Sequence, residues 1–279
     1  MVRLTLRLKD LFVSISRKLT ILPTKLTPRE TTYEGIFTSF DQVYEYYKTS
    51  SRYISPDSYS KDLEKASKNR DTFLKRGFCV PSWISNRNSL FSIFLSGIQF
   101  ERLRILDVGG GFGETYLELK SSINREFDYF ILEFPRTAID AKKMYLENPD
   151  LEYISSFDDV TFTPDVVYFG SSLQYFEEYQ SVLERVAELN PSYVVISDTP
   201  MGDMGTFVCA QVNMPQVVIP RWIFNRHEIV MIFAKLNYKL MHESFLYYPF
   251  HNFDNYPLSY RSTFHSNLVF QINPTSTRI

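Results

Sequence analysis

Apolar and polar positions between residues 103 and 197 follow two alternating patterns. Short apolar runs suited to buried strands occur at 103–108, 127–133, 151–155, 165–170 and 193–197. The stretches between them place apolar residues at helical spacing, at 114–120, 136–146 and 179–189. Strands that alternate with helices predict an α/β domain, with a parallel sheet covered by helices on both faces.

The first part of the chain lacks this alternation. We predict a mostly helical extension over residues 1–98 and the α/β domain over residues 99–279. Six tyrosines fall between positions 33 and 59, and aromatic faces stack on sugar rings. The extension is therefore expected to cover a substrate site, to pack against the α/β domain, or to do both.

Glycine is scarce and unevenly placed. The chain holds ten glycines, and Gly109, Gly110, Gly111 and Gly113 stand together between a predicted strand and a predicted helix. A turn without side chains lets a nucleotide-bearing ligand approach the backbone. The spacing is Asp-x-Gly-x-Gly-x-Gly from Asp107, and it departs from the G-x-G-x-x-G of dinucleotide sites. Carboxylates on both sides favour a ligand without phosphates, such as S-adenosylmethionine, although a tight turn that binds nothing is the alternative.

The carboxyl ends of the predicted strands carry further candidate ligands. Glu133 ends the second strand and can accept two hydrogen bonds from a ribose diol; the alternative is an ordinary solvent-facing glutamate. Ligands of parallel sheets bind beyond these ends. The remaining positions we assign to cofactor binding are Phe134, Ser156, Phe157, Gly170, Ser171 and Gln174.

Composition narrows the function. The formal charge of −2 does not favour electrostatic binding to nucleic acid. The 24 Phe, 19 Tyr and 2 Trp indicate a globular protein with a packed core. Cys79 and Cys209 are the only cysteines, which excludes a disulfide framework and a cysteine-rich zinc site. HExxH, paired cysteines and a DxDxDG calcium loop are all missing from the sequence, so we expect no metal; Mg²⁺ bound by scattered carboxylates is the alternative. No apolar run is long enough to span a bilayer, which predicts a cytoplasmic protein.

These residues resemble a class I S-adenosylmethionine-dependent methyltransferase. The likeness lies in LDVGGGFG at 106–113, LE at 132–133, DVVYFGSSLQYF at 165–176 and YVVISDTP at 193–200. It implies a Rossmann-like seven-stranded sheet. The C-terminal part fits, with a helix over 225–236 and strands near 239–247 and 267–273, the last of them antiparallel to the others.

More narrowly, the chain resembles a methyltransferase family associated with surface-polysaccharide (O-antigen and exopolysaccharide) biosynthesis. The shared features are YEGIFTSF at 33–40, Asn-Arg-Asp at 69–71, GGGFG at 109–113, LQYF at 173–176, DTP at 198–200, Gln-Val at 211–212 and PRWIF at 220–224. Gly111 and Ile219 depart from the family pattern, which often has Ser and Tyr there. The resemblance implies a carbohydrate acceptor, lipid-linked or nucleotide-activated, whose hydroxyl is methylated.

Methylation of a sugar hydroxyl by in-line displacement calls for a general base. We predict His227 for this role because its ordinary pKa is close to neutral pH, with Asp198 orienting it or serving instead. Tyr175 is the third residue that we assign to catalysis, and both Tyr175 and Gln174 are expected to contact methionine or the acceptor. The alternatives are a polar helix-start residue at His227, a turn at Asp198 and an aromatic that packs inward at Tyr175.

Other function classes stay open. The acceptor is alternatively a small molecule or a phenol, and the fold alternatively serves a non-catalytic binding protein. A nicotinamide-dependent oxidoreductase is disfavoured by the missing G-x-G-x-x-G. Residues 1–30 hold seven basic and two acidic side chains with an apolar stripe at helical spacing. This pattern is typical of a helix that lies on an anionic membrane surface, packs on its own domain or meets a second copy of the chain.

Overall fold

A computed structural model of the chain describes residues 33–49, 56–77, 83–214, 217–247, 253, 255–261 and 264–273. Residues 31–279 form one compact unit. The helix predicted over residues 1–30 lies outside the described residues, as does Cys79. In the described part of the chain, no helix is both long and apolar enough to cross a bilayer.

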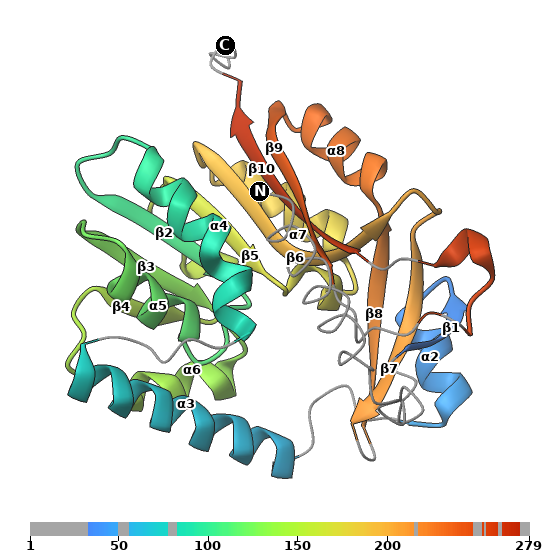
Figure 1. The fold of residues 1–279 in the computed structure, drawn as a ribbon, viewed down its shortest axis with the longest axis horizontal. Coiled ribbons are helices and arrows are strands. Elements are labelled where there is room, and N and C mark those ends of the chain that lie inside the picture. The colour runs from blue at the N-terminus through green and yellow to red at the C-terminus, as the bar shows by residue number, and fades with distance from the viewer. Residues whose placement is uncertain are drawn as a thin grey trace, which may run out of the picture. The chain divides into compact units, whose positions relative to one another are not determined.

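Seven strands form the predicted sheet, in the order β4–β3–β2–β5–β6–β10–β9 (Figure 1). The first five of these run parallel, and β10 is antiparallel to both of its neighbours. The bounds are β2 (Leu103–Val108), β3 (Phe127–Leu132), β4 (Leu151–Ile154), β5 (Val166–Gly170), β6 (Tyr193–Gly202), β9 (Tyr238–Tyr247) and β10 (Phe264–Ile272). The predicted α/β class and the antiparallel last strand are confirmed.

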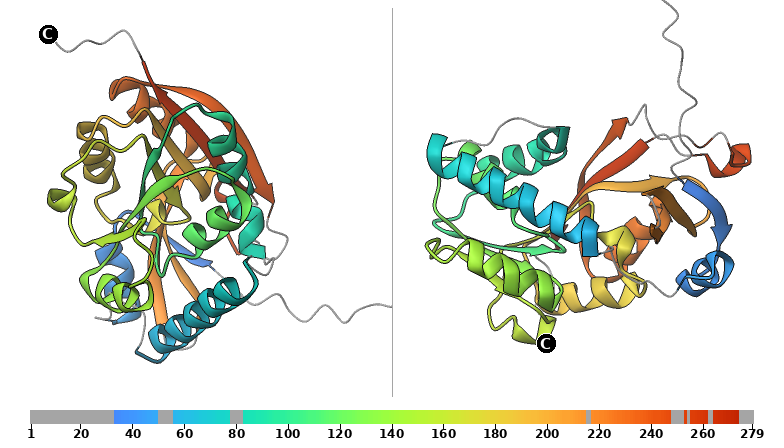
Figure 2. Two further views of the ribbon diagram at one scale, coloured as in Figure 1. Left: turned by 90° about the vertical axis from the view of Figure 1, so that its left-hand side faces the viewer. Right: turned by 90° about the horizontal axis from the view of Figure 1, so that it is seen from below.

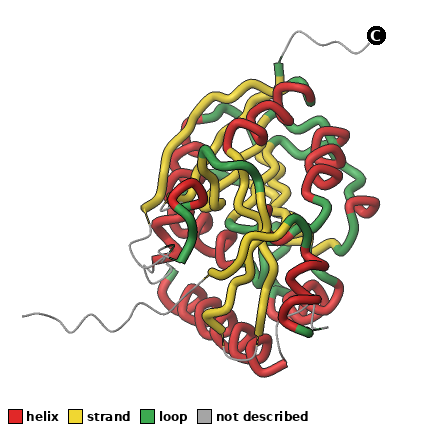
Figure 3. Tube along the Cα trace, turned by 90° about the vertical axis from the view of Figure 1, so that its right-hand side faces the viewer, coloured by secondary structure: helices red, strands yellow, loops and turns green. Residues whose placement is uncertain are grey.

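Helices cover both faces of this sheet, and Figure 3 shows the strands lying between them. Leu106 and Val108 pack with α7 and α8 on one face, whereas Leu103 and Ile105 pack with α4 and α5 on the other. This alternation follows from the two-residue repeat of a strand. The helices are α4 (Trp83–Gly97), α5 (Glu114–Ser122), α6 (Pro135–Met144), α7 (Tyr179–Glu188) and α8 (Arg226–Lys235).

Three further strands extend the sheet beyond the carboxyl end of β6, which makes it ten-stranded. They are β1 (Tyr33–Phe37), β7 (Phe207–Met214) and β8 (Val217–Asn225). β8 pairs in parallel with the last two residues of β6, β7 forms an antiparallel hairpin with β8, and β1 pairs with the outer side of β7. The sequence patterns did not predict these strands, and β1 lies in the segment predicted to be mostly helical.

The N-terminal helices pack at two different places. α2 (Phe40–Tyr47) buries Phe40 and Val43 against β7. α3 (Pro56–Arg76) runs beside α5 and α6 (Figure 2). It is held there by hydrogen bonds from Tyr59 to Asp140 (2.9 Å) and from Asn69 to Glu114 (3.0 Å). Short 3₁₀ helices complete the fold: η1 (Phe157–Asp159), η2 (Leu173–Tyr175) and η3 (Leu258–Tyr260).

Candidate active site

The turn between β2 and α5 takes a path that favours glycine at three positions. Gly109, Gly111 and Gly113 have φ angles of 77°, 58° and 82°, in the left-handed region that other residues rarely enter. A Cβ atom on Gly109 would lie 2.7 Å from the Cβ atom of Ser172. A Cβ atom on Gly111 would meet nothing within 4 Å. The middle of the turn therefore faces open space.

That space is a cavity of ≈ 270 Å³. Its walls come from the glycine turn, the start of α5, the end of β5 and one side of α3. The lining residues are Asp62, Lys65, Ala66, Asp107, Gly109, Gly110, Gly111, Phe112, Glu114, Thr115, Gly170 and Ser171. The cavity thus lies at the carboxyl ends of the parallel strands, where ligands of such sheets bind.

Two carboxylates lie next to the glycine turn, and one of them is hydrogen-bonded to it. The Tyr129 hydroxyl donates to Oδ2 of the buried Asp107 at 2.7 Å. Glu133 accepts from the backbone N–H of Gly111 at 3.0 Å and from that of Phe134 at 2.9 Å. Burial raises the pKa of the Glu133 carboxyl, although both backbone donors act in the opposite direction. Glu133, which was predicted to accept from a ribose diol, is thus hydrogen-bonded to the glycine turn itself.

The end of β5 forms the next part of the site. Ser171 has a positive φ of 59°, a strained conformation for a residue with a side chain. Its backbone oxygen accepts from Nε2 of the fully buried Gln174 at 2.8 Å. No described residue is hydrogen-bonded to the Gln174 carbonyl oxygen. The structure therefore brings Gly170 and Ser171 to the cavity, with Gln174 packed beneath Ser171.

Asp198 lies at a bulge in β6. Between the pairs Ser266↔Thr199 and Leu268↔Ile196, two residues of β6 oppose one of β10. The second of the two is Asp198, with a φ of 55°. A bulge of this kind redirects a side chain.

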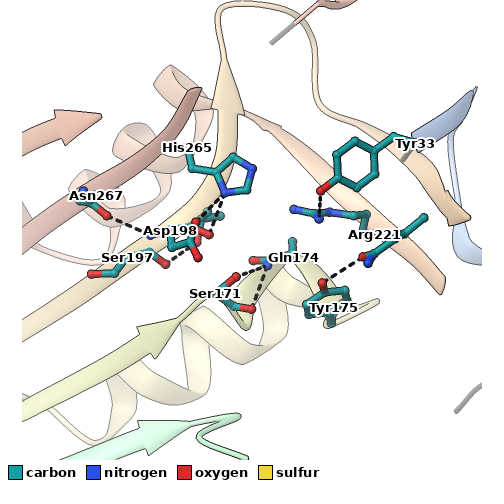
Figure 4. A network of polar contacts seen from close by, with 11 residues as sticks. Tyr33, Ser171, Gln174, Tyr175, Ser197, Asp198, Arg221, His265 and Asn267 are labelled. Carbon is teal, nitrogen blue, oxygen red and sulfur yellow. Dashed lines mark hydrogen bonds and ion pairs between the residues drawn. The ribbon is translucent and has the colours of Figure 1, made fainter. Parts of the chain in front are cut away.

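The Asp198 carboxylate meets a histidine that the sequence analysis did not single out. Its Oδ1 lies 2.7 Å from Nδ1 of His265 on β10, and both residues are buried (Figure 4). Burial lowers the pKa of His265, and the nearby Arg221 acts in the same direction, while hydrogen bonding to Asp198 opposes both. The imidazole is thus neutral at neutral pH, with its Nδ1 proton directed at Asp198.

A buried arginine lies beside this pair. Arg221 of β8 is 3% exposed and donates from Nη1 to the Tyr33 hydroxyl at 2.8 Å. Its guanidinium carbon lies 4.7 Å from the centre of the Tyr33 ring and 5.6 Å from that of Tyr175. The Tyr175 hydroxyl donates to Oε1 of Gln211 at 3.2 Å. Tyr175, predicted from the sequence to be catalytic, therefore lies beside the arginine.

Other predicted site residues lie apart from this cluster. His227 is exposed at the start of α8. The end of β8 just before it pairs with the last residues of β6, where Asn225 is opposite Gly202, and Asp198 lies four residues further back along β6. The structure thus does not bring His227 to Asp198, whose carboxylate pairs with His265. Phe134 is 60% exposed. Ser156 caps η1, and Phe157 packs partly against the core; none of these three lines the cavity.

A larger hollow of ≈ 570 Å³ occurs elsewhere, next to the amino end of β2. It is lined by Ser96, Ile98, Gln99, Phe100, Glu101, Ile123, Asn124 and Arg125. Because ligands of parallel sheets bind at the opposite edge, this hollow is the weaker candidate. Within the described ranges, no three His, Cys, Asp or Glu side chains are grouped as metal ligands.

Solved structures share this architecture. No family model matches the sequence, and no curated protein matches it significantly. A Haloferax volcanii protein, solved in complex with the methyltransferase activator Trm112, superposes with a TM-score of 0.51 at 14% identity, over 78% of this chain and 99% of its own. The fold is the class I methyltransferase fold. At this identity, the likeness extends to the fold alone.

Two further structures are similar at lower TM-scores. An S-adenosylmethionine-dependent methyltransferase of Methanosarcina mazei has a TM-score of 0.47 and 13% identity, over 64% of this chain and 96% of its own. A Burkholderia thailandensis 1,6-didemethyltoxoflavin N1-methyltransferase has a TM-score of 0.48 and 11% identity, over 81% of this chain and 94% of its own.

Proposed function

We propose that this protein is an S-adenosylmethionine-dependent O-methyltransferase. The observation that carries the proposal is that the glycine-turn cavity and the Asp198–His265 pair occupy one edge of the sheet. The first can hold a methyl donor and the second can take a proton from a hydroxyl group. The class I methyltransferase fold supports the same proposal.

The cavity suits this methyl donor on two counts. Gly111 leaves backbone open where an adenosyl group would approach, and the Glu133 carboxylate lies next to that backbone to accept from a ribose diol. The cavity is also lined by three carboxylates, from Asp62, Asp107 and Glu114, against the single ammonium group of Lys65. Such a lining attracts the sulfonium and ammonium groups of S-adenosylmethionine and repels the phosphates of a dinucleotide.

When bound, S-adenosylmethionine supplies a methyl group on a sulfonium, which a hydroxyl oxygen can attack. The protein orients the acceptor and takes up its proton. His265 is placed for the second task because Asp198 holds Nδ1–H, which leaves the lone pair on Nε2. The glycine turn and Glu133 would hold this donor; its carbon–sulfur bond would break as the hydroxyl oxygen took the methyl group, and Nε2 of His265 would accept the hydroxyl proton. A base of this kind contributes roughly 10²- to 10⁴-fold.

We assign a carbohydrate as the acceptor class. An aliphatic hydroxyl needs a base, which the Asp198–His265 pair provides, and the ring of Tyr175, which is 41% exposed, offers a face on which a sugar can stack. The resemblance to methyltransferases of surface-polysaccharide biosynthesis points to the same class. A phenol is the second candidate, because the Tyr175 ring could hold it as well.

Thermal-shift titration tests the cofactor half of the proposal. S-adenosylhomocysteine should raise the melting temperature, and NAD should not. Glu133→Ala should reduce the S-adenosylhomocysteine shift, whereas Glu188→Ala on the exposed side of α7 should leave it unchanged. Transfer of labelled methyl to a panel of glycans and phenols then identifies the acceptor. If S-adenosylhomocysteine produces no shift, the proposal is wrong.

A further inference from the structure

The Arg221 guanidinium is buried with only part of its hydrogen-bonding capacity used. Nη1 donates to Tyr33, but Nε and Nη2 have no hydrogen-bond partner in the part of the chain that the structure describes. The same residues provide no carboxylate within ion-pair distance of Arg221. A guanidinium stays protonated at every accessible pH, and leaving it buried without an anion is costly.

The unused atoms form one edge of the guanidinium. Nε–H and one Nη2–H lie side by side, and this is the edge that binds two oxygens of a carboxylate in parallel. Tyr33 occupies the other side, with its ring and hydroxyl against the guanidinium. Burial raises the pKa of Tyr33 to about 12, so the phenol stays protonated and adds no negative charge. Tyr33 therefore orients Arg221 without neutralising its charge.

Arg221 also faces the reaction centre. Figure 4 shows its guanidinium extending from β8 toward His265 and Asp198. It is close enough to act electrostatically on both residues, although neither forms a hydrogen bond with it. The ring of Tyr175, which is 41% exposed, lies on the side of the guanidinium that faces away from Tyr33 (Figure 4). The cation is thus one side chain away from solvent and next to the proposed base.

We propose that Arg221 binds a carboxylate of the acceptor through Nε and Nη2, and so places the acceptor hydroxyl against His265. This inference rests on the proposed function, because it assigns the acceptor of the same site. The acceptor is then an acidic molecule, such as a uronic acid residue of a glycan. A single guanidinium with a planar two-donor edge matches the charge and shape of a carboxylate. A diphosphate carries more charge than this one cation balances.

Direct binding measurements test the carboxylate. The probes are two matched pairs, D-glucuronate with D-glucose and benzoate with benzyl alcohol, titrated calorimetrically into the full-length protein saturated with S-adenosylhomocysteine. We expect at least one acid to bind about tenfold more tightly than its neutral partner. Arg221→Gln should remove this preference because it removes the positive charge. Arg221→Lys should remove it as well, because lysine keeps the charge but lacks the two parallel N–H donors of the guanidinium. Arg226→Gln should keep it, since Arg226 is already paired with Glu243 and Asp203.

The outcomes separate this inference from the proposed function. Equal affinity for the acid and the neutral compound in both pairs would contradict the proposal that Arg221 binds a carboxylate. A preference for the acid that persists in both Arg221 variants would contradict it as well. Binding of inorganic phosphate but of neither acid also overturns it and identifies a phosphate site. S-adenosylhomocysteine binding and circular dichroism of each variant report whether the protein is folded. If the wild-type protein fails to bind S-adenosylhomocysteine, the proposed function fails, while the acid preference measured without it still decides the role of Arg221.

Discussion

Asp198 Oδ1 and His265 Nδ1 lie 2.7 Å apart, although 67 residues separate them in the sequence. The contact depends on the bulge in β6, which turns the Asp198 side chain toward β10. The Asp198 backbone N–H, which the bulge removes from the regular ladder, donates to the Asn267 side chain at 2.9 Å. The strained φ of Asp198 is thereby held by contacts on both its main chain and its side chain.

Removing the imidazole should slow methyl transfer without weakening cofactor binding. We expect His265→Ala to lower kcat by roughly 10²- to 10⁴-fold, the usual contribution of a general base. Asp198→Asn should also lower kcat. The carboxylate can only accept a hydrogen bond and so keeps the proton on Nδ1 of His265, whereas an amide can also donate and does not fix this tautomer. His227→Ala serves as the matched control, since His227 is exposed. A normal kcat in His265→Ala would show that His265 is not the base, and a large loss in His227→Ala would assign that role to His227.

The Asp198–His265 pair should make both the stability of the fold and kcat depend on pH. Burial lowers the pKa of His265 below its ordinary value of about 6.5, so the folded protein binds this proton more weakly than the unfolded chain does. The stability from His265 is therefore complete above pH about 6.5 and is lost as the pH falls below it. The kcat profile should have an acid limb with a midpoint below that value. His265→Gln should abolish the limb and flatten stability across the same range. A midpoint above 6.5 would contradict this assignment.

The glycine turn offers a paired test of backbone strain and ligand access. Gly111 and Gly77 both have positive φ, 58° and 72°, and a Cβ on either would meet nothing within 4 Å. Alanine at each should therefore cost a similar amount, about 1–2 kcal/mol of unfolding free energy. Gly111 lines the cavity and Gly77 does not. Only Gly111→Ala should weaken S-adenosylhomocysteine binding, by about tenfold or more in calorimetry. Equal binding by the two variants would show that the ligand does not approach Gly111.

The sequence predicted the parallel sheet well because its strands are buried on both faces. Runs such as 103–108 and 193–197 are almost continuously apolar, and the glycine turn marks where the ligand cavity begins. The helix predicted over 225–236 is α8, capped by the Asn225 side chain at 3.0 Å from the Glu228 N–H. These elements depend on local patterns that can be recognised without the fold.

The β7–β8 hairpin was not predicted from the sequence, and the residues of β8 give the physical reason. Pro220 and the charged Arg221 interrupt the apolar run of β8, and proline is unusual within a sheet. β8 accommodates it opposite Ala210. β1 is only five residues long and includes Gly35, so its pattern is weak.

His265 was missed because its role comes from a distant contact. The strand predicted near 267–273 starts at Phe264, so His265 fell just outside it. A sequence shows neither the register of β10 against β6 nor the bulge that points Asp198 at the ring. The one available signal was the small number of histidines, four in the whole chain.

The Tyr33–Arg221 contact joins residues 188 positions apart. Tyr33 belongs to β1, the outermost strand, which no strand of the seven-stranded core needs for its own pairing. A variant that lacks β1 would therefore keep the pairing of the seven-stranded core and lose the Tyr33 ring and hydroxyl beside Arg221, while Tyr175 stays next to the guanidinium. Under the proposed function, a change in β1 can thus alter acceptor choice without altering the glycine-turn cavity, which β1 does not line.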